Sequence, residues 1–347
     1  MKKSTLLYVL VVSLFVAAPV TPAVADPPHP IRAAIDAGAD RLVDIQNPDG
    51  GWEWVVGLSL CGGSCPNLFG VTALGLVDAY RVTHDGDHLA AAARAADALI
   101  AKHAAAPACD ANPATGTDRP YTVDTSFLTD ISHLGKVGSI VGPAGKKNYR
   151  KVAKAWFACV MADFPTGAVR ADNRIDGRIA QGLNNLGAWD ASLDIRAAMD
   201  VHQRDYALAE ALQVIARATD WDVVDPDCSG CENLSKGLFL AATHELQGDP
   251  TVRNARNVWK GQLLLAQLPD GSWGGDTQVT AYIVMGLAET SDSKPTKKAI
   301  KAAVGFLLAR QNSFGGFNSS ATDPTEYGEV DGEVLQALFA AADHDDD

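Results

Sequence analysis

The sequence predicts an all-α protein folded as a closed (α/α)6 toroid, with six helix pairs of about 44 residues each. Three observations lead to this prediction: a repeated phrase, its spacing, and an alternation of two kinds of helix. The phrase links a glutamine to an aromatic residue across a glycine turn, and it occurs at Gln46–Trp52, Gln267–Trp273 and Gln311–Phe317. The last two copies begin 44 residues apart, and the first lies almost five such intervals before the second.

Each repeat is predicted to contain one outer and one inner helix. The first helix of a pair is apolar on one side only, whereas the second is apolar around most of its circumference. The predicted outer helices span 30–46, 87–104, 147–164, 203–219, 250–268 and 294–311, and the inner helices 68–83, 121–135, 191–202, 232–246, 276–289 and 328–342. Because the chain opens on an outer helix and ends on an inner one, the sixth pair can close against the first. An open solenoid is the alternative.

The first 25 residues are predicted to be a signal peptide. Lys2 and Lys3 precede an apolar run at 6–18, and a small-residue cleavage site follows at 23–25. Residues 26–342 then form a single toroid domain with an insertion at 165–190, and residues 343–347 form an acidic tail. We therefore expect a secreted or periplasmic protein.

Composition and charge exclude several classes of partner. With 47% hydrophobic residues the chain can form a core, and after residue 25 no segment approaches the roughly 20 apolar residues of a membrane span. The formal net charge of −13, which becomes −15 without residues 1–25, argues against nucleic acid and anionic membranes. We expect neither nucleic-acid binding nor membrane insertion. The sequence does not indicate an oligomeric state.

Six cysteines are expected to form disulfides, because export favours oxidation. Cys61 and Cys65 form one close pair, Cys228 and Cys231 a second, and Cys109 and Cys159 remain for a third. A zinc site built from the two close pairs, or a redox Cys-x-x-Cys, is the alternative.

The glutamine-aromatic phrases resemble the QW-type repeat of squalene and other terpene cyclases and of protein prenyltransferase β-subunits. The segment 263–281 is the most similar. This resemblance implies an α/α toroid in which the glutamine and the aromatic brace one helix end against the next turn. The catalytic motifs of these families are mostly missing. The only match to the Asp-x-Asp-Asp motif of the cyclases is Asp343–Asp346, in the predicted tail.

The candidate site comes from aligning the six inner helices. At the middle level of one face, the first three repeats carry Asp78, Asp130 and Asp200, and the last three carry Ala241, Gly286 and Ala337. We expect the three aspartates, with His133 beside them, to form an acidic and potentially catalytic cavity wall opposite a wall with little side-chain volume. Aspartates on a wet pore surface or in local ion pairs with Arg81 and His133 are the alternative interpretation.

Further residues of the same face, or at the mouth, are candidate ligand contacts: Arg196, Tyr282, Glu333, His244 and Trp54. The expected partner is a neutral or cationic small molecule or a glycan. A glycan-degrading hydrolase or lyase using paired carboxylates is the alternative, and a divergent terpene-cyclase-like protein is the second. The sequence indicates no cofactor, and aspartates spaced along helices are too weak a pattern to assign a metal site. His84, His88 and His103 are interpreted as inert residues of loops or the outer layer.

Overall fold

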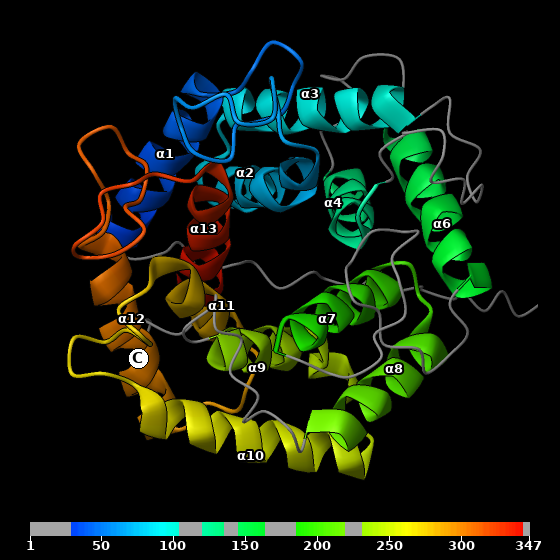
Figure 1. Ribbon diagram of the computed structural model, residues 1–347, viewed down its shortest axis with the longest axis vertical. Coiled ribbons are helices and arrows are strands. Elements are labelled where there is room, and N and C mark those ends of the chain that lie inside the picture. Colours follow the sequence, from blue (N-terminus) through cyan, green and yellow to red (C-terminus); the bar gives the residue numbers. More distant parts are fainter. Residues whose placement is uncertain (1–28, 104–119, 135–144, 164–184, 219–230, 343–347) are drawn as a thin grey trace, which may run out of the picture.

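The computed structural model describes residues 29–103, 120–134, 145–163, 185–218 and 231–342. They form twelve α-helices in two concentric rings (Figure 1). Within these ranges, β pairing is limited to isolated bridges between loops. The predicted all-α toroid is confirmed.

The outer and inner helices alternate along the chain. The outer ring consists of α1 (His29–Asp44), α3 (Gly86–His103), α6 (Gly145–Asp163), α8 (Arg204–Arg217), α10 (Pro250–Ala266) and α12 (Lys294–Leu308). The inner ring consists of α2 (Phe69–Thr83), α4 (Thr122–His133), α7 (Asn185–Asp200), α9 (Cys231–Ala242), α11 (Thr277–Ala288) and α13 (Gly328–Ala342). The predicted limits differ most for α7, which begins six residues early, inside the predicted insertion.

The repeated phrase is a brace between neighbouring outer helices. The Gln46 amide donates to the carbonyl of Gly50 in its own turn and to that of Ala91 in α3, at 2.8 and 3.0 Å. The Trp52 indole N–H donates to the Leu42 carbonyl at the end of α1, at 2.9 Å. Gln267 and Trp273 repeat this arrangement, with Ala299 of α12 and Leu263 of α10. Each tryptophan thus satisfies a carbonyl in the last turn of an outer helix, which has no intrahelical partner, and each glutamine ties its turn to the next outer helix.

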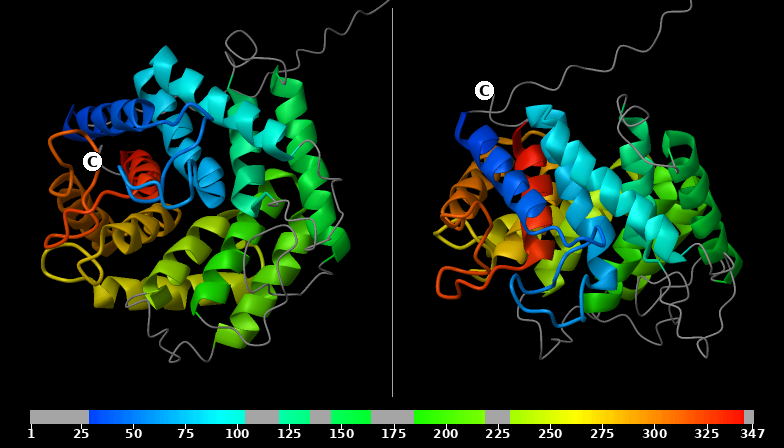
Figure 2. Two further views of the ribbon diagram at one scale, coloured as in Figure 1. Left: turned by 45° about the horizontal axis from the view of Figure 1, so that its top comes forward. Right: turned by 90° about the horizontal axis from the view of Figure 1, so that it is seen from above.

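The third copy of the phrase closes the ring. Gln311 donates to the carbonyl of Ala34 in α1, 277 residues earlier, at 2.9 Å. Beside it, the Arg41 guanidinium pairs with Glu326 at 2.7 Å. Figure 2 shows the last helix, α13, beside α1 and α2. The first and last repeats therefore share an interface, as a closed toroid requires.

Paired glycines let the inner helices approach closely. A Cβ added at Gly286 of α11 would lie 2.1 Å from the carbonyl oxygen of Gly237 in α9. A Cβ at Gly75 of α2 would likewise lie 2.5 Å from the carbonyl oxygen of Gly332 in α13. Our interpretation of Gly286 as cavity space for a ligand is therefore wrong, because this position is filled by the backbone of the neighbouring helix.

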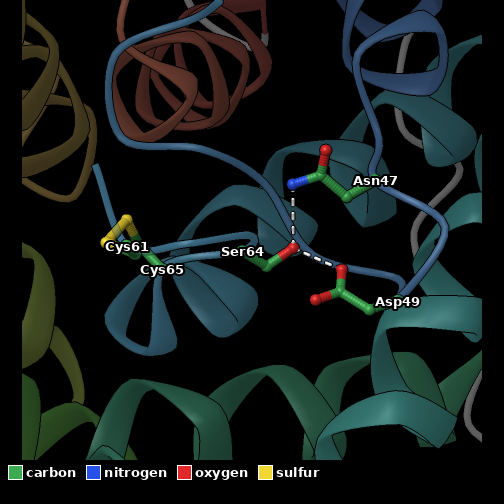
Figure 3. The surroundings of a disulfide bond; sticks show 5 residues. All are labelled: Asn47, Asp49, Cys61, Ser64 and Cys65. Carbon is green, nitrogen blue, oxygen red and sulfur yellow. Dashed lines mark hydrogen bonds between the residues drawn. A yellow bond between two sulfur atoms is a disulfide. The ribbon is translucent and has the colours of Figure 1, made fainter. Parts of the chain in front are cut away.

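One rim loop carries a disulfide between Cys61 and Cys65, just before α2 (Figure 3). In the same loop, the Asn47 amide donates to the Ser64 hydroxyl at 3.0 Å, and Ser64 donates to Asp49. The bond confirms the first predicted pair and excludes a zinc site that uses its thiolates. Cys159 is also disulfide-bonded.

Several predicted features lie outside the described residues: the signal peptide, the acidic tail, Cys109, Cys228 and residues 165–184 of the insertion. Cys231 begins α9, but its side chain is not among those described. Within the described part of the chain, no helix combines the length and hydrophobicity needed to cross a membrane.

Candidate functional site

A pocket of about 270 Å³ lies at the carboxyl ends of the inner helices. Three of its lining residues are the predicted aspartates Asp78, Asp130 and Asp200. They come from the last two turns of α2, α4 and α7, which are consecutive members of the inner ring. The sequence alignment places these three carboxylates at equivalent positions of three inner helices, and the structure brings them together in one pocket.

Arg81 joins two of these carboxylates. Its guanidinium lies 2.5 Å from the Asp78 carboxylate, one turn earlier in α2, and 3.5 Å from that of Asp130 in α4. Asp78 is buried, and this burial raises its pKa to about 6, against the opposing effect of Arg81. The local ion pair therefore exists, but Arg81 also connects two helices of the pocket wall.

Asp200 is the carboxylate with spare hydrogen-bonding capacity. Among the described residues, its Oδ2 has no hydrogen-bond partner. Burial raises the pKa of Asp200 to about 6, the negative charge of Asp130 raises it further, and Arg196 opposes both. A carboxyl group with this pKa can hold or release a proton near neutral pH.

The remaining lining combines polar and charged side chains with apolar methionines and alanines. Predicted ligand contacts Arg196 and His244 line the pocket, together with Glu245 and Glu289. The ring of His244 lies 3.2 Å from Glu289. The described lining has five carboxylates (Asp78, Asp130, Asp200, Glu245 and Glu289) and two guanidinium groups (Arg81 and Arg196).

The helix ends add to this negative potential. Because outer and inner helices alternate in direction, the six inner helices run parallel and their carboxyl ends share one mouth (Figure 1). Each carboxyl end carries a partial negative charge on its unsatisfied carbonyl groups. The pocket is therefore electrostatically suited to a cation or to a neutral ligand rich in hydrogen-bond donors.

Tyr282 and Glu333 meet outside this pocket. The Tyr282 hydroxyl donates to Glu333 Oε1 at 2.6 Å, and the Gln278 amide donates to the same oxygen at 3.2 Å. Both partners of the first bond are buried, and the Trp189 ring packs edge-on against Tyr282 at 6.2 Å. Our expectation that Tyr282 and Glu333 share one cavity surface with the three aspartates is not met. They belong to the packing between α11 and α13.

His133 and Trp54 are also absent from the described lining of the pocket. His133 is exposed at the end of α4. Trp54 is 45% exposed in the loop before α2, where its carbonyl accepts the backbone N–H of Gly328. Of the three small residues expected opposite the aspartates, Ala241 lines the pocket, whereas Gly286 and Ala337 are enclosed by neighbouring helices.

Gln336 is a pocket residue that the sequence analysis missed. It accepts a hydrogen bond from Arg196 at 3.3 Å and donates to the carbonyl of Val71 in α2 at 3.1 Å. It therefore positions Arg196 from the opposite side of the ring. The sequence analysis selected Glu333 and Ala337 of α13 for the cavity face. The polar side chain of Gln336, directly before Ala337, was the signal that could have identified it.

No protein-family model matches the sequence, and no curated protein is significantly similar to it. Solved structures do share the fold. An unsaturated glucuronyl hydrolase specific for heparin superposes with a TM-score of 0.62 at 12% identity, covering 90% of this chain and 97% of its own. A possible GH105 family member from Salmonella enterica gives 0.59 at 11% identity, with coverages of 94% and 98%.

A second class of protein has the same architecture. The type II terpene cyclase MstE from Scytonema superposes with a TM-score of 0.55 at 16% identity, covering 91% of this chain and 98% of its own. At these identities the comparisons establish the α/α toroid fold, which serves glycan hydrolases and terpene cyclases alike.

Proposed function

We propose that this protein binds a cationic or neutral saccharide, most favourably an amino-sugar glycan, in the pocket at the carboxyl ends of its inner helices. The observation that carries the proposal is the lining itself, with five carboxylates against two guanidinium groups. Hydrogen-bond acceptors of this kind suit the hydroxyl and ammonium groups of amino sugars.

The comparisons support a glycan as the ligand class, whereas the charge of the pocket argues against an acidic glycan. The glucuronyl hydrolase that shares the fold is described as specific for heparin. A glucuronate carboxylate in the present pocket would meet net negative charge and the negative helix ends, which costs binding energy. An isoprenoid is supported less well, because the described lining contains no Phe, Tyr or Trp ring to stabilise a carbocation.

Ligand charge and Asp200 provide the test. Isothermal titration calorimetry at pH 7 would compare tetramers of glucosamine, N-acetylglucosamine and glucuronate-containing heparosan. We expect the glucosamine tetramer to bind best and heparosan at least about tenfold more weakly. In the parent, protonation of Asp200 should weaken glucosamine binding below pH 6. Asp200→Asn should weaken glucosamine binding about tenfold at pH 7 and should remove this further decrease in affinity below pH 6. Asp205→Asn, an exposed change in α8, serves as the control.

The proposal fails if heparosan binds as well as the glucosamine tetramer, or if Asp200→Asn and Asp130→Asn both bind glucosamine like the parent. The melting temperature of each variant separates loss of the site from loss of the fold.

Glycan hydrolysis is the second candidate, and the titration of the aspartates favours it. Asp78 and Asp200 both have a pKa of about 6 and border the same pocket as Asp130. Hydrolysis of a glycosidic bond needs one protonated and one ionised carboxyl group. Chain shortening of the glucosamine tetramer, abolished by Asp200→Asn, would establish catalysis. A tetramer that stays intact at saturating protein would leave binding as the function.

A further inference from the structure

Asp36, Asp40 and His88 bring three potential metal ligands together on the outer surface of the toroid. The two aspartates are one turn apart on α1, and His88 lies in the first turn of α3. One oxygen of each carboxylate and one nitrogen of the imidazole all lie within 4.8 Å of one another. This cluster involves none of the residues that line the pocket at the inner-helix ends.

Thr83 holds one nitrogen of the His88 ring. The Thr83 hydroxyl donates its only proton to the Ala79 carbonyl in α2, at 3.0 Å. With the hydroxyl proton on the Ala79 carbonyl, Thr83 Oγ1 accepts a hydrogen bond from His88, whose Nδ1 lies 3.0 Å away. In that arrangement the proton of the neutral ring is on Nδ1, and Nε2 carries a lone pair.

That lone pair points at another acceptor. His88 Nε2 lies 3.1 Å from Asp40 Oδ1, and the His88 side chain is fully buried while Asp36 and Asp40 are exposed. Two acceptors at this distance repel unless a positive charge is shared between them. The charge can be a proton on Nε2 or a metal ion bound by both atoms. A proton is shared between two atoms only, whereas a metal ion takes several ligands. Asp36 supplies a second carboxylate as a third ligand.

We propose that Asp36, Asp40 and His88 bind one divalent transition-metal ion, with water completing its coordination. Imidazole and carboxylate ligands suit Zn²⁺, whereas Ca²⁺ prefers oxygen ligands alone. Ligands bonded at about 2.0–2.2 Å to one Zn²⁺ lie roughly 3–4 Å apart, the spacing already present between Asp40 and His88.

The surroundings are suited to such a site. Thr83 orients the ligating ring through its second nitrogen, as hydrogen-bond partners of metal-bound histidines commonly do. A surface hollow lined by Asp36, Thr83 and Asp85, among others, gives the ion and its waters access. A bound ion would join α1 to α3, and through Thr83 to the end of α2, so it would stabilise the first two repeats beside the ring closure.

Titration of tag-free, chelator-treated protein with ZnCl₂ tests the proposal. We expect one Zn²⁺ per chain and a higher melting temperature. Asp40→Asn and Asp36→Asn should each weaken binding at least tenfold, and Thr83→Val should weaken it about 10- to 100-fold while leaving all three ligands in place. Asp44→Asn, the same change at an exposed position of α1, is the matched control and should bind like the parent.

His88→Gln addresses the nitrogen ligand. Because His88 is buried, the variant must first show the circular dichroism spectrum of the parent, and its metal binding is then measured by Co²⁺ absorption. The ¹⁵N NMR spectrum of the His88 ring in the parent provides an independent measurement that needs no substitution. Zn²⁺ should shift the Nε2 resonance and leave Nδ1 protonated. The proposal is overturned if the ring stays doubly protonated at saturating Zn²⁺, if Ca²⁺ binds as tightly as Zn²⁺, or if Asp40→Asn retains the parent's affinity.

Discussion

The protein is expected to lose stability as the pH rises from 5 to 8. Burial raises the pKa of Asp78 and Asp200 to about 6 and that of Asp124 and Glu329 to about 7. Burial also holds the pKa of Glu333 well above its usual range. A carboxyl group with a raised folded-state pKa stabilises the fold below its unfolded pKa near 4, and this contribution is lost as the pH rises through the folded-state pKa.

The size of the effect follows from the shifts. Each unit of pKa difference corresponds to about 1.4 kcal/mol, so several such groups together make a drop of a few kcal/mol. We expect the melting temperature to fall by about 5–10 °C between pH 5 and pH 8. Differential scanning calorimetry over this range makes the measurement. A melting temperature that is constant or higher at pH 8 would show that these carboxyl groups are not buried as described.

Glu333→Gln isolates the contribution of one of these buried carboxyl groups. The glutamine carbonyl still accepts from Tyr282 and Gln278, and its amide takes the place of Oε2, which has no hydrogen-bond partner among the described residues. The variant should be more stable than the parent at pH 8 and less dependent on pH. Glu53→Gln, in the loop before α2, should follow the parent curve.

Gly286→Ala is expected to destabilise the toroid strongly. The added methyl group would overlap the carbonyl oxygen of Gly237, and backbone atoms of a packed helix cannot move aside without separating α11 from α9. We expect a loss of about 3 kcal/mol, at the upper end for overpacked cores, measured by urea unfolding.

Gly305→Ala is the matched control for this substitution. Gly305 is exposed in the outer helix α12, and a Cβ there meets no atom within 4 Å. Alanine should therefore stabilise the protein by up to about 1 kcal/mol through its helix propensity. If both variants were destabilised equally, the close approach of α9 and α11 would not be the cause.

The sequence predicted the fold well because the toroid is periodic. The 44-residue spacing and the polarity of each helix determine which helices are outer and which are inner, and the braces of Gln267 and Gln311 lie where the repeated phrase indicated. The start of α7 was misplaced because it follows the insertion, where the period is interrupted.

The candidate site was predicted only in part, since helix register gives the direction of a side chain but not its surroundings. It identified Asp78, Asp130 and Asp200 as one group, and these do border one pocket. Helix register could not show that Gly286 faces the backbone of a neighbouring helix or that Tyr282 donates a hydrogen bond to Glu333. It also dismissed His88, whose partners lie on other helices.

A crystal structure with the glucosamine tetramer tests the central claim most directly, because it locates the ligand without reference to activity. The account predicts sugar density in the pocket at the carboxyl ends of the inner helices, with an ammonium or hydroxyl group within hydrogen-bond distance of the Asp200 carboxylate and with Asp130 undisplaced from Arg81. Density at the opposite mouth of the ring, or an empty pocket at ligand concentrations that saturate binding in solution, would contradict it.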